Sequence, residues 1–125
     1  MLSKNQVVKA RKAIESMYDG TCTIIERQKV KLPNKSTGFM DIVVLEDIPC
    51  RLSFKTITNT TQAETGVSAV VQVTKVFIAP EIKVKPGSKL TITQNDVTTE
   101  YKSSGQPAIY TTHQEIELEL FERWA

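Results

Sequence analysis

The sequence predicts a mainly β fold, a small β-barrel or sandwich of six to seven antiparallel strands with one N-terminal helix and one long polar loop. Several segments after Gly20 alternate apolar and polar residues with a period of two, which is typical of strands with one buried face. Clusters of turn-forming residues separate these segments at short intervals. Only residues 3–18 show a helical period, so the strand–helix–strand alternation of doubly wound α/β folds is absent.

The length and composition are those of one globular domain, residues 1–125. The chain has 125 residues, of which 40% are hydrophobic and 24% are charged, and a domain of this size buries roughly two-thirds of its unfolded surface. The formal net charge of +2 argues against a polybasic nucleic-acid binder of the histone type. No apolar run is long enough for a transmembrane helix and no secretory signal is visible, so we expect a cytoplasmic protein with reduced cysteines.

Residues 3–18 are expected to form the helix. Ser3 suits the N-cap, and Asp19 and Gly20 end the helical pattern. One face carries apolar residues at helical spacing, namely Val7, Ala10, Ile14 and Met17. The other face is basic, which either solvation or contact with DNA or an acidic neighbour would explain.

The first strand region covers residues 21–55. Two β-branched segments flank a cluster of turn residues that begins at Pro33. The last part alternates strictly, which places Cys50 and Phe54 on the buried side of a strand. Cys50, like Cys22, is therefore expected to be a buried, reduced thiol in the core.

The second strand region covers residues 69–121. Pro80 interrupts its first strand, which is expected to continue through Ile82 and Val84 to a Pro-Gly turn. Two further clusters of turn residues separate the later strands. The final strand is expected over residues 108–121.

A polar, threonine-rich segment, residues 56–68, separates the two strand regions and is expected to be a long loop. Loops of this length are uncommon in a compact domain and are usually functional or disordered. A chain of that length projects roughly 20 Å there and back, far enough to reach a central channel in a ring of subunits. The residues expected in such a channel or gating loop are Thr58, Asn59, Thr60, Thr61, Gln62, Glu64, Thr65 and Gly66. An ordinary surface loop is the alternative.

We expect no catalytic, metal-binding or cofactor-binding residues, and so no enzyme. His113 is the one histidine, and Cys22 and Cys50 fit a core better than a nucleophilic pair with it. The three residues lack the paired spacing of a zinc site. No glycine-rich phosphate-binding motif occurs, so no cofactor or small-molecule substrate is expected.

Three carboxylates alternate with apolar residues near the end of the sequence. Glu115, Glu117 and Glu119 are expected to face solvent, whereas the apolar residues between and after them, Ile116, Leu118 and Leu120, are expected to face the core. Such a row is more often an exposed stripe than a catalytic acid pair. We therefore expect it to form a subunit interface, in contact with a basic surface of a neighbour.

Several segments together resemble the head-closure, or stopper, proteins of the head–tail connector in tailed phages and prophages, including defective phage-like prophages. They are YDGTC at 18–22, VLEDIPCRLSF at 44–54, IAPEIKVKPGSKLTI at 78–92 and HQEIELE at 113–119. Their order follows the family along nearly the whole chain. One departure is Ser88, where the family often carries an acidic residue after the glycine.

The resemblance implies a small β-barrel that forms a ring with itself below the portal and adaptor, completes the DNA channel, helps retain DNA and docks the tail. It implies no enzyme activity, no cofactor and no membrane, and DNA that passes without sequence-specific binding. The protein would lie in the host cytoplasm during assembly and then in the neck of a virion or phage-tail-like particle. The alternatives are a tail-terminator or other tail-tube component, and an oligonucleotide-binding β-barrel module. The last would need exposed aromatics between basic residues, whereas the aromatics here are scattered about one per element.

Overall fold

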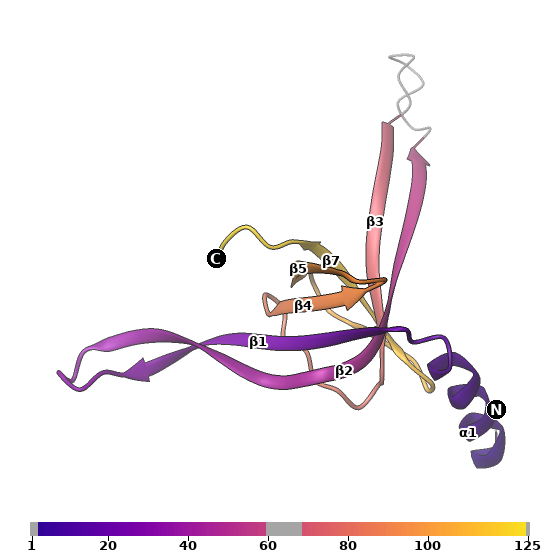
Figure 1. Ribbon diagram of the computed structural model, residues 1–125, viewed down its shortest axis with the longest axis horizontal. Coiled ribbons are helices and arrows are strands. Elements are labelled where there is room, and N and C mark those ends of the chain that lie inside the picture. Colours follow the sequence, from indigo (N-terminus) through magenta and orange to yellow (C-terminus); the bar gives the residue numbers. More distant parts are fainter. Residues whose placement is uncertain (1–2, 60–68, 125) are drawn as a thin grey trace.

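The structure is a computed structural model that describes residues 3–59 and 69–124 (Figure 1). Over these residues the chain forms one helix and seven strands. In chain order they are α1 (Lys4–Glu15), β1 (Gly20–Lys31), β2 (Thr37–Asn59), β3 (Ala69–Ile78), β4 (Lys89–Gln94), β5 (Val97–Ser103), β6 (Ala108–Ile109) and β7 (Gln114–Leu120). The predicted mainly β fold of antiparallel strands with one N-terminal helix is confirmed.

All the described strands belong to one antiparallel sheet, and this sheet closes on itself. The spatial order is β3-β2-β1-β4-β5-β7-β6, and β3 also pairs with β7. Six strands therefore form a ring, which we call the closed sheet, and β6 is a short addition beside β7. Closure gives each strand of the ring a hydrogen-bonded neighbour on both sides over part of its length.

The core fills the inside of the closed sheet, where alternate residues of its strands point inward. Its buried hydrophobic residues are Cys22, Ile24, Cys50, Leu52, Val76, Ile78, Val84, Leu90, Ile92, Tyr101, Ile116 and Leu118. Gly20 begins β1 where its neighbours approach closely. A Cβ there would lie 3.1 Å from the carbonyl oxygen of Thr93 and 3.2 Å from that of Cys50, so a larger residue would push against backbone.

Both cysteines lie in this core as free thiols, as predicted. A hydrogen bond with the Cys50 thiol, together with burial, raises the pKa of the Cys22 thiol far above its ordinary range. The Cys22 thiol therefore stays protonated at neutral pH and packs as a small apolar group.

Two pairs of strands continue beyond the closed sheet. β1 pairs with β4 only as far as Ile25, so residues 26–31 pair with residues 37–42 of β2 alone; we call this projection the β1–β2 arm. At the other end of β2, residues 55–59 pair with 69–73 of β3 alone and form the β2–β3 arm. Figure 1 shows the two arms and α1 leaving the closed sheet in three different directions.

Helix α1 is shorter than the predicted range 3–18. Ser3 is the N-cap, as expected, and its hydroxyl accepts a hydrogen bond from the backbone N–H of Gln6. The backbone N–H of Ser3 donates in turn to the side-chain oxygen of Gln6, so the two residues form a capping box. The regular helix ends at Glu15, and the backbone N–H of Met17 then donates a hydrogen bond to the carbonyl of Ile14, three residues earlier. A tightened last turn of this kind satisfies carbonyls at the helix end.

The strand predicted to continue through Ile82 and Val84 is absent. Pro80 lacks the N–H that a strand would donate, and the Gln114 side chain donates to the carbonyls of Ala79 and Ile82 instead. The segment is therefore an irregular link, although the Val84 side chain remains in the core.

The loop predicted over residues 56–68 begins later than expected, because β2 continues to Asn59. Residues 56–59 pair with 69–72 of β3. Strand pairing uses backbone groups, and threonine and isoleucine favour extended backbone, so the polar composition did not end the strand. The remaining residues of the predicted loop, 60–68, lie outside the described residues.

The final strand predicted over residues 108–121 is interrupted. It divides into β6 and β7 because the N–H of Tyr110 donates to the carbonyl of His113 at 2.8 Å. This turn folds β6 back beside β7, so that Ala108 lies opposite Glu115.

Two apolar side chains expected in the core are exposed instead. Phe54 is 56% exposed because β1 begins at Gly20, opposite Cys50, and no longer runs beside β2 at this point. Leu120 is 67% exposed, since the pairing of β7 with β3 ends at Leu118. In both cases inward and outward positions still alternate along the strand, but the neighbouring strand that would cover the side chain, β1 for Phe54 and β3 for Leu120, has ended.

Candidate assembly surfaces

Clustered reactive groups are absent from the part of the chain that the structure describes. It contains no group of three or more His, Cys, Asp or Glu residues placed to hold a metal ion. Cys22 and Cys50 lie in the core, whereas His113 stacks on Tyr110 with ring centroids 5.0 Å apart and meets the edge of Phe77 at 5.7 Å. Residues 3–59 and 69–124 contain no helix with the length and apolar character needed to cross a membrane.

Most of the residues expected to form a gating loop lie outside the described residues. Thr58 and Asn59 belong to β2, where they stand opposite Val70 and Ala69 of β3. Thr60, Thr61, Gln62, Glu64, Thr65 and Gly66 fall in the segment that is not described.

The acidic row on β7 faces away from the core along most of its length. Glu117 and Glu119 are exposed, while Ile116 before them and Leu118 between them are buried. Glu115 is half-buried and already has partners, since its carboxylate lies 3.1 Å from Nε2 of His113 and 3.6 Å from Nζ of Lys75. The two carboxylates available to another molecule are therefore Glu117 and Glu119.

Two lysines stand beside this row, and sequence reasoning missed both. In the sheet register Lys75 of β3 lies opposite Glu117, and Lys102 of β5 lies opposite Glu119. Lys75 forms its ion pair with Glu115 instead. Within the described chain, neither Glu117 nor Glu119 has an ion pair within 4 Å. Only the strand order could have shown this arrangement, because the lysines are distant in sequence.

The β1–β2 arm, the turn at its tip and the β2 residues that follow it carry the largest group of exposed apolar side chains. Phe39 and Met40 are 57% and 58% exposed, and Leu32, Val43 and Val44 are also exposed. Over the arm the outer edges of both strands have no strand partner in the described structure. A two-stranded ribbon is only marginally stable alone in water, and open apolar edges favour pairing with another chain. The arm therefore has the properties of a contact surface.

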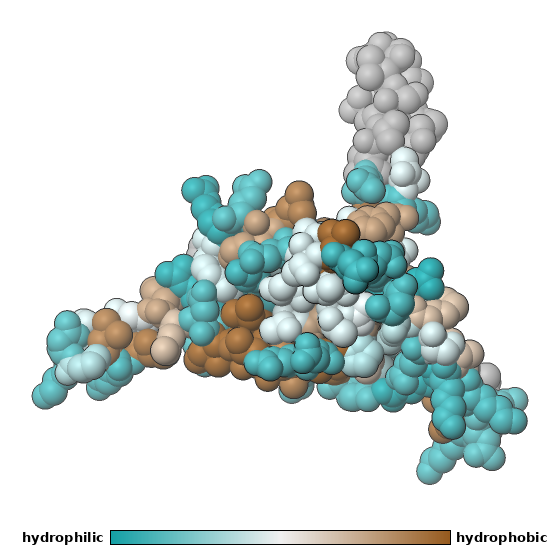
Figure 2. All heavy atoms as spheres, viewed as in Figure 1, coloured by the Kyte–Doolittle hydropathy of each residue, from teal (hydrophilic) through white to brown (hydrophobic). Residues whose placement is uncertain are grey.

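One face of the arm is cationic. Arg27, Lys29 and Lys31 alternate along β1, so they share a face, and all three are exposed. Phe39 stands opposite Lys29, and the Arg27 guanidinium lies over its ring, 4.8 Å from the centroid. Figure 2 shows this mixture of hydrophilic and hydrophobic residues along the projection at the left. The spacing of the three cations is visible in the sequence and could have marked this face.

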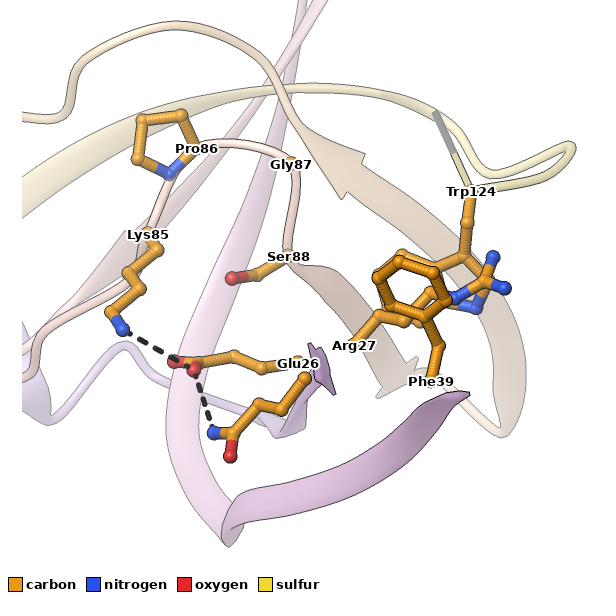
Figure 3. A pocket seen from close by; sticks show the side chains of 9 residues that line it. Glu26, Arg27, Phe39, Lys85, Pro86, Gly87, Ser88 and Trp124 are labelled. Atoms are coloured by element: carbon orange, nitrogen blue, oxygen red, sulfur yellow. Dashed lines mark hydrogen bonds and ion pairs between the residues drawn. The ribbon is translucent and has the colours of Figure 1, made fainter. Parts of the chain in front are cut away.

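A pocket of about 410 Å³ lies at the base of the arm (Figure 3). Arg27 and Phe39 line one side together with Trp124, and the segment 85–88 lines the other. Glu26 at its floor is held by Lys85, with 3.7 Å between the charged atoms. The Arg27 guanidinium is occupied by the Phe39 ring, and arginine and aromatic residues are enriched in protein interfaces, so the pocket suits a side chain from another protein.

A smaller pocket of about 300 Å³ separates the end of the helix from the closed sheet. Met17, Tyr18, Arg51 and His113 are among its lining residues. The Tyr18 hydroxyl is buried with no hydrogen-bond partner in the described structure, and burial raises the pKa of Tyr18. No residue of α1 is buried, so this helix covers the sheet only loosely.

Comparison with known proteins adds one structural similarity. No family model matches the chain, and no curated protein matches it. Among solved structures, the phage-like element PBSX protein xkdH from Bacillus subtilis is similar with a TM-score of 0.47 and 14% sequence identity. The similarity covers 80% of this chain and 91% of that one.

Proposed function

We propose that this protein is a structural subunit of a phage or prophage neck, and that it forms a head-closure ring. The observation that carries the proposal is the β1–β2 arm, a two-stranded projection with open edges and exposed Phe39 and Met40. Surfaces of this kind serve protein association rather than catalysis. The order of sequence segments that resemble head-closure proteins supports the same role.

In this role the partners are other copies of the chain, the portal and adaptor on one side and tail proteins on the other. DNA passes through the ring without sequence-specific contact. The subunit acts in the host cytoplasm during assembly and then in the neck of a virion or phage-tail-like particle. The chain supplies shape and contact surface, and no chemistry is assigned to it.

Removal of the protein from an inducible phage or prophage tests this proposal. We expect heads and tails to accumulate separately in electron micrographs, with heads that have lost their DNA, and complementation to restore joined particles. The control is a complementing copy with the paired exposed substitutions Lys55→Glu and Lys83→Glu. Joined, infectious particles at normal yield without the protein would contradict the proposal.

The same experiment separates the two alternative functions. A tail-terminator or tail-tube component predicts heads that retain DNA together with tails that are absent or of irregular length. An oligonucleotide-binding module predicts normal particles and salt-sensitive binding of short single strands by the purified protein.

A further inference from the structure

We infer that the cationic face of the β1–β2 arm in one copy of this protein docks on the β7 acidic row of the next copy, in a head-to-tail contact. The inference deepens the proposed function, since it names the two surfaces that would join neighbouring subunits. It rests on two rows of opposite charge that the fold displays on different sides of one chain.

The two rows have the same spacing. Lys29 and Lys31 are two residues apart on β1, as Glu117 and Glu119 are on β7. Alternate residues of a strand repeat at about 6.5–7 Å, so one pair of cations can meet one pair of carboxylates in register. Sheets that pack face to face lie about 10 Å apart, a gap that a lysine and a glutamate side chain span together.

Both rows are free to pair within the described structure. Lys29 and Lys31 are exposed and form no ion pair there, and the same holds for Glu117 and Glu119. Of the neighbouring charges, Arg27 lies over Phe39 and Glu115 binds Lys75. Each surface also carries one charge of the opposite sign, Asp41 opposite Arg27 and Lys102 opposite Glu119, but the row of two keeps the sign of its surface. The unpaired charges of the two surfaces are therefore complementary.

Apolar contact accompanies the charges on both sides. Phe39 lies beside the cationic row, opposite Lys29. Phe121 follows the acidic row and meets the edge of Trp124, with ring centroids 5.1 Å apart. Aromatic residues anchor protein interfaces, whereas a nucleic-acid backbone offers nothing that would cover Phe39. A second copy fits the arm better than DNA for this reason.

The contact would join two different surfaces of the chain, as the subunits of a ring do. The arm leaves the closed sheet on one side and β7 lies on the body of the molecule (Figure 1), so the two surfaces of one chain do not meet each other. A contact between different surfaces of identical subunits is heterologous, and it closes into a ring when the rotation permits.

Reciprocal charge reversal tests the inference. Lys29→Glu with Lys31→Glu makes the arm acidic, and Glu117→Lys with Glu119→Lys makes the row basic. We expect each double variant to weaken self-association of the purified protein at least tenfold, measured by sedimentation velocity over a concentration series. The quadruple variant restores opposite charges and is expected to associate again. The paired substitutions Lys55→Glu and Lys83→Glu, at exposed positions outside the β1–β2 arm, α1 and β7, match the change in net charge of the arm variant and should leave association unchanged.

Several outcomes would overturn the inference. These are a wild-type chain that stays monomeric at every concentration, a quadruple variant that does not recover, or a control as damaging as the arm variant. A 20-base-pair DNA duplex serves as a further probe. If reversal at Lys29 and Lys31 abolishes its binding and leaves self-association intact, the arm is a nucleic-acid surface instead. Charge-dependent association together with normal particles in the deletion strain would refute only the proposed neck function.

Discussion

At the scale of single residues, the Gln114 side chain supplies hydrogen bonds where no strand pairs with the link after β3. It is buried, and its amide donates to two backbone carbonyls, those of Ala79 and Ile82, that no strand pairs with. A buried carbonyl without a hydrogen bond costs about 1–3 kcal/mol. This one side chain therefore fixes the irregular link between β3 and β4.

Gln114→Leu should consequently destabilise the protein by about 1–3 kcal/mol, because the Ile82 carbonyl loses its donor while the Ala79 carbonyl keeps the N–H of Ile82. Leucine keeps the volume but supplies no N–H. Urea unfolding at neutral pH measures the loss, and Gln106→Leu, at an exposed loop position, is the control. A Gln114→Leu variant as stable as the wild type would show that water replaces the amide.

The Cys22 thiol links stability to alkaline pH. Its pKa is raised in the folded protein, whereas in the unfolded chain it returns to about 8.5. Above that pH the unfolded chain loses a proton that the folded protein keeps, so stability falls as the pH rises. The slope from this one group approaches about 1.4 kcal/mol per pH unit.

Unfolding of the wild type and of Cys22→Ala at pH 7, 9 and 10 measures this slope. We expect a steeper loss of stability in the wild type between pH 9 and 10, even if the alanine variant is less stable throughout. Lysine deprotonation affects both proteins and cancels in the comparison. Parallel pH profiles would mean that the thiol ionises equally in both states.

At the scale of elements, α1 is held by an ion pair and by half-buried side chains. No helix residue is buried, and Arg11 joins Glu15 of the helix to Glu81 of the link after β3. The Arg11 guanidinium also lowers the pKa of the Glu81 carboxyl. This ion pair is therefore one attachment of the helix, beside the half-buried side chains Val7, Ala10 and Ile14 on its apolar face.

Arg11→Ala should therefore loosen α1 without unfolding the sheet. We expect faster amide hydrogen exchange in residues 4–15 and an unchanged urea midpoint for the rest of the chain. Lys12→Ala, at an exposed neighbouring position, is the matched control. An equal loss of protection in both variants would place the attachment elsewhere.

Element types were more predictable than element ends. Alternation showed which side of β7 holds Ile116 and Leu118, because inward and outward positions follow from the strand period. It could not show where a covering strand stops, so Phe54 and Leu120 were expected in the core and are exposed. Nor could local sequence place Lys75 beside Glu117, which depends on the pairing of β3 with β7.

At the scale of the whole molecule, stability should be concentrated in the closed sheet. The arm residues 26–31 and 37–42 include no buried side chain, whereas β4 and β7 contribute Leu90, Ile92 and Ile116 to the core. Local opening costs little where few apolar groups are buried.

Native-state hydrogen exchange measures this difference directly. We expect hydrogen-bonded amides of the β1–β2 arm to exchange at least about 100-fold faster than those of β4 and β7. The comparison is made in dilute protein, where association does not protect the arm. Equal protection factors in the arm and in the closed sheet would contradict the expectation.

The architecture could be predicted from the sequence only in part. Antiparallel strands, the leading helix and the buried cysteines follow from local patterns. The closure of the sheet through β3 and β7 and the two arms follow from long-range pairing instead. β2 is part of both arms because its 23 residues are more than either β1 or β3 can pair with. The local sequence of β2 does not show how long its partner strands are.

The β1–β2 arm has a consequence for how such chains can diverge over evolution. Since no core side chain lies in it, residues can be inserted or lost there without disturbing the closed sheet. The strand period still constrains the change. Two residues gained in each strand keep Lys29 and Lys31 on their face, while a single residue gained in each turns the outer half of the ribbon over. Proteins descended from one ancestor should therefore differ in this hairpin by an even number of residues in each strand. The surface that contacts a neighbour would then become longer or shorter, while Lys29 and Lys31 stay on the same face of the ribbon.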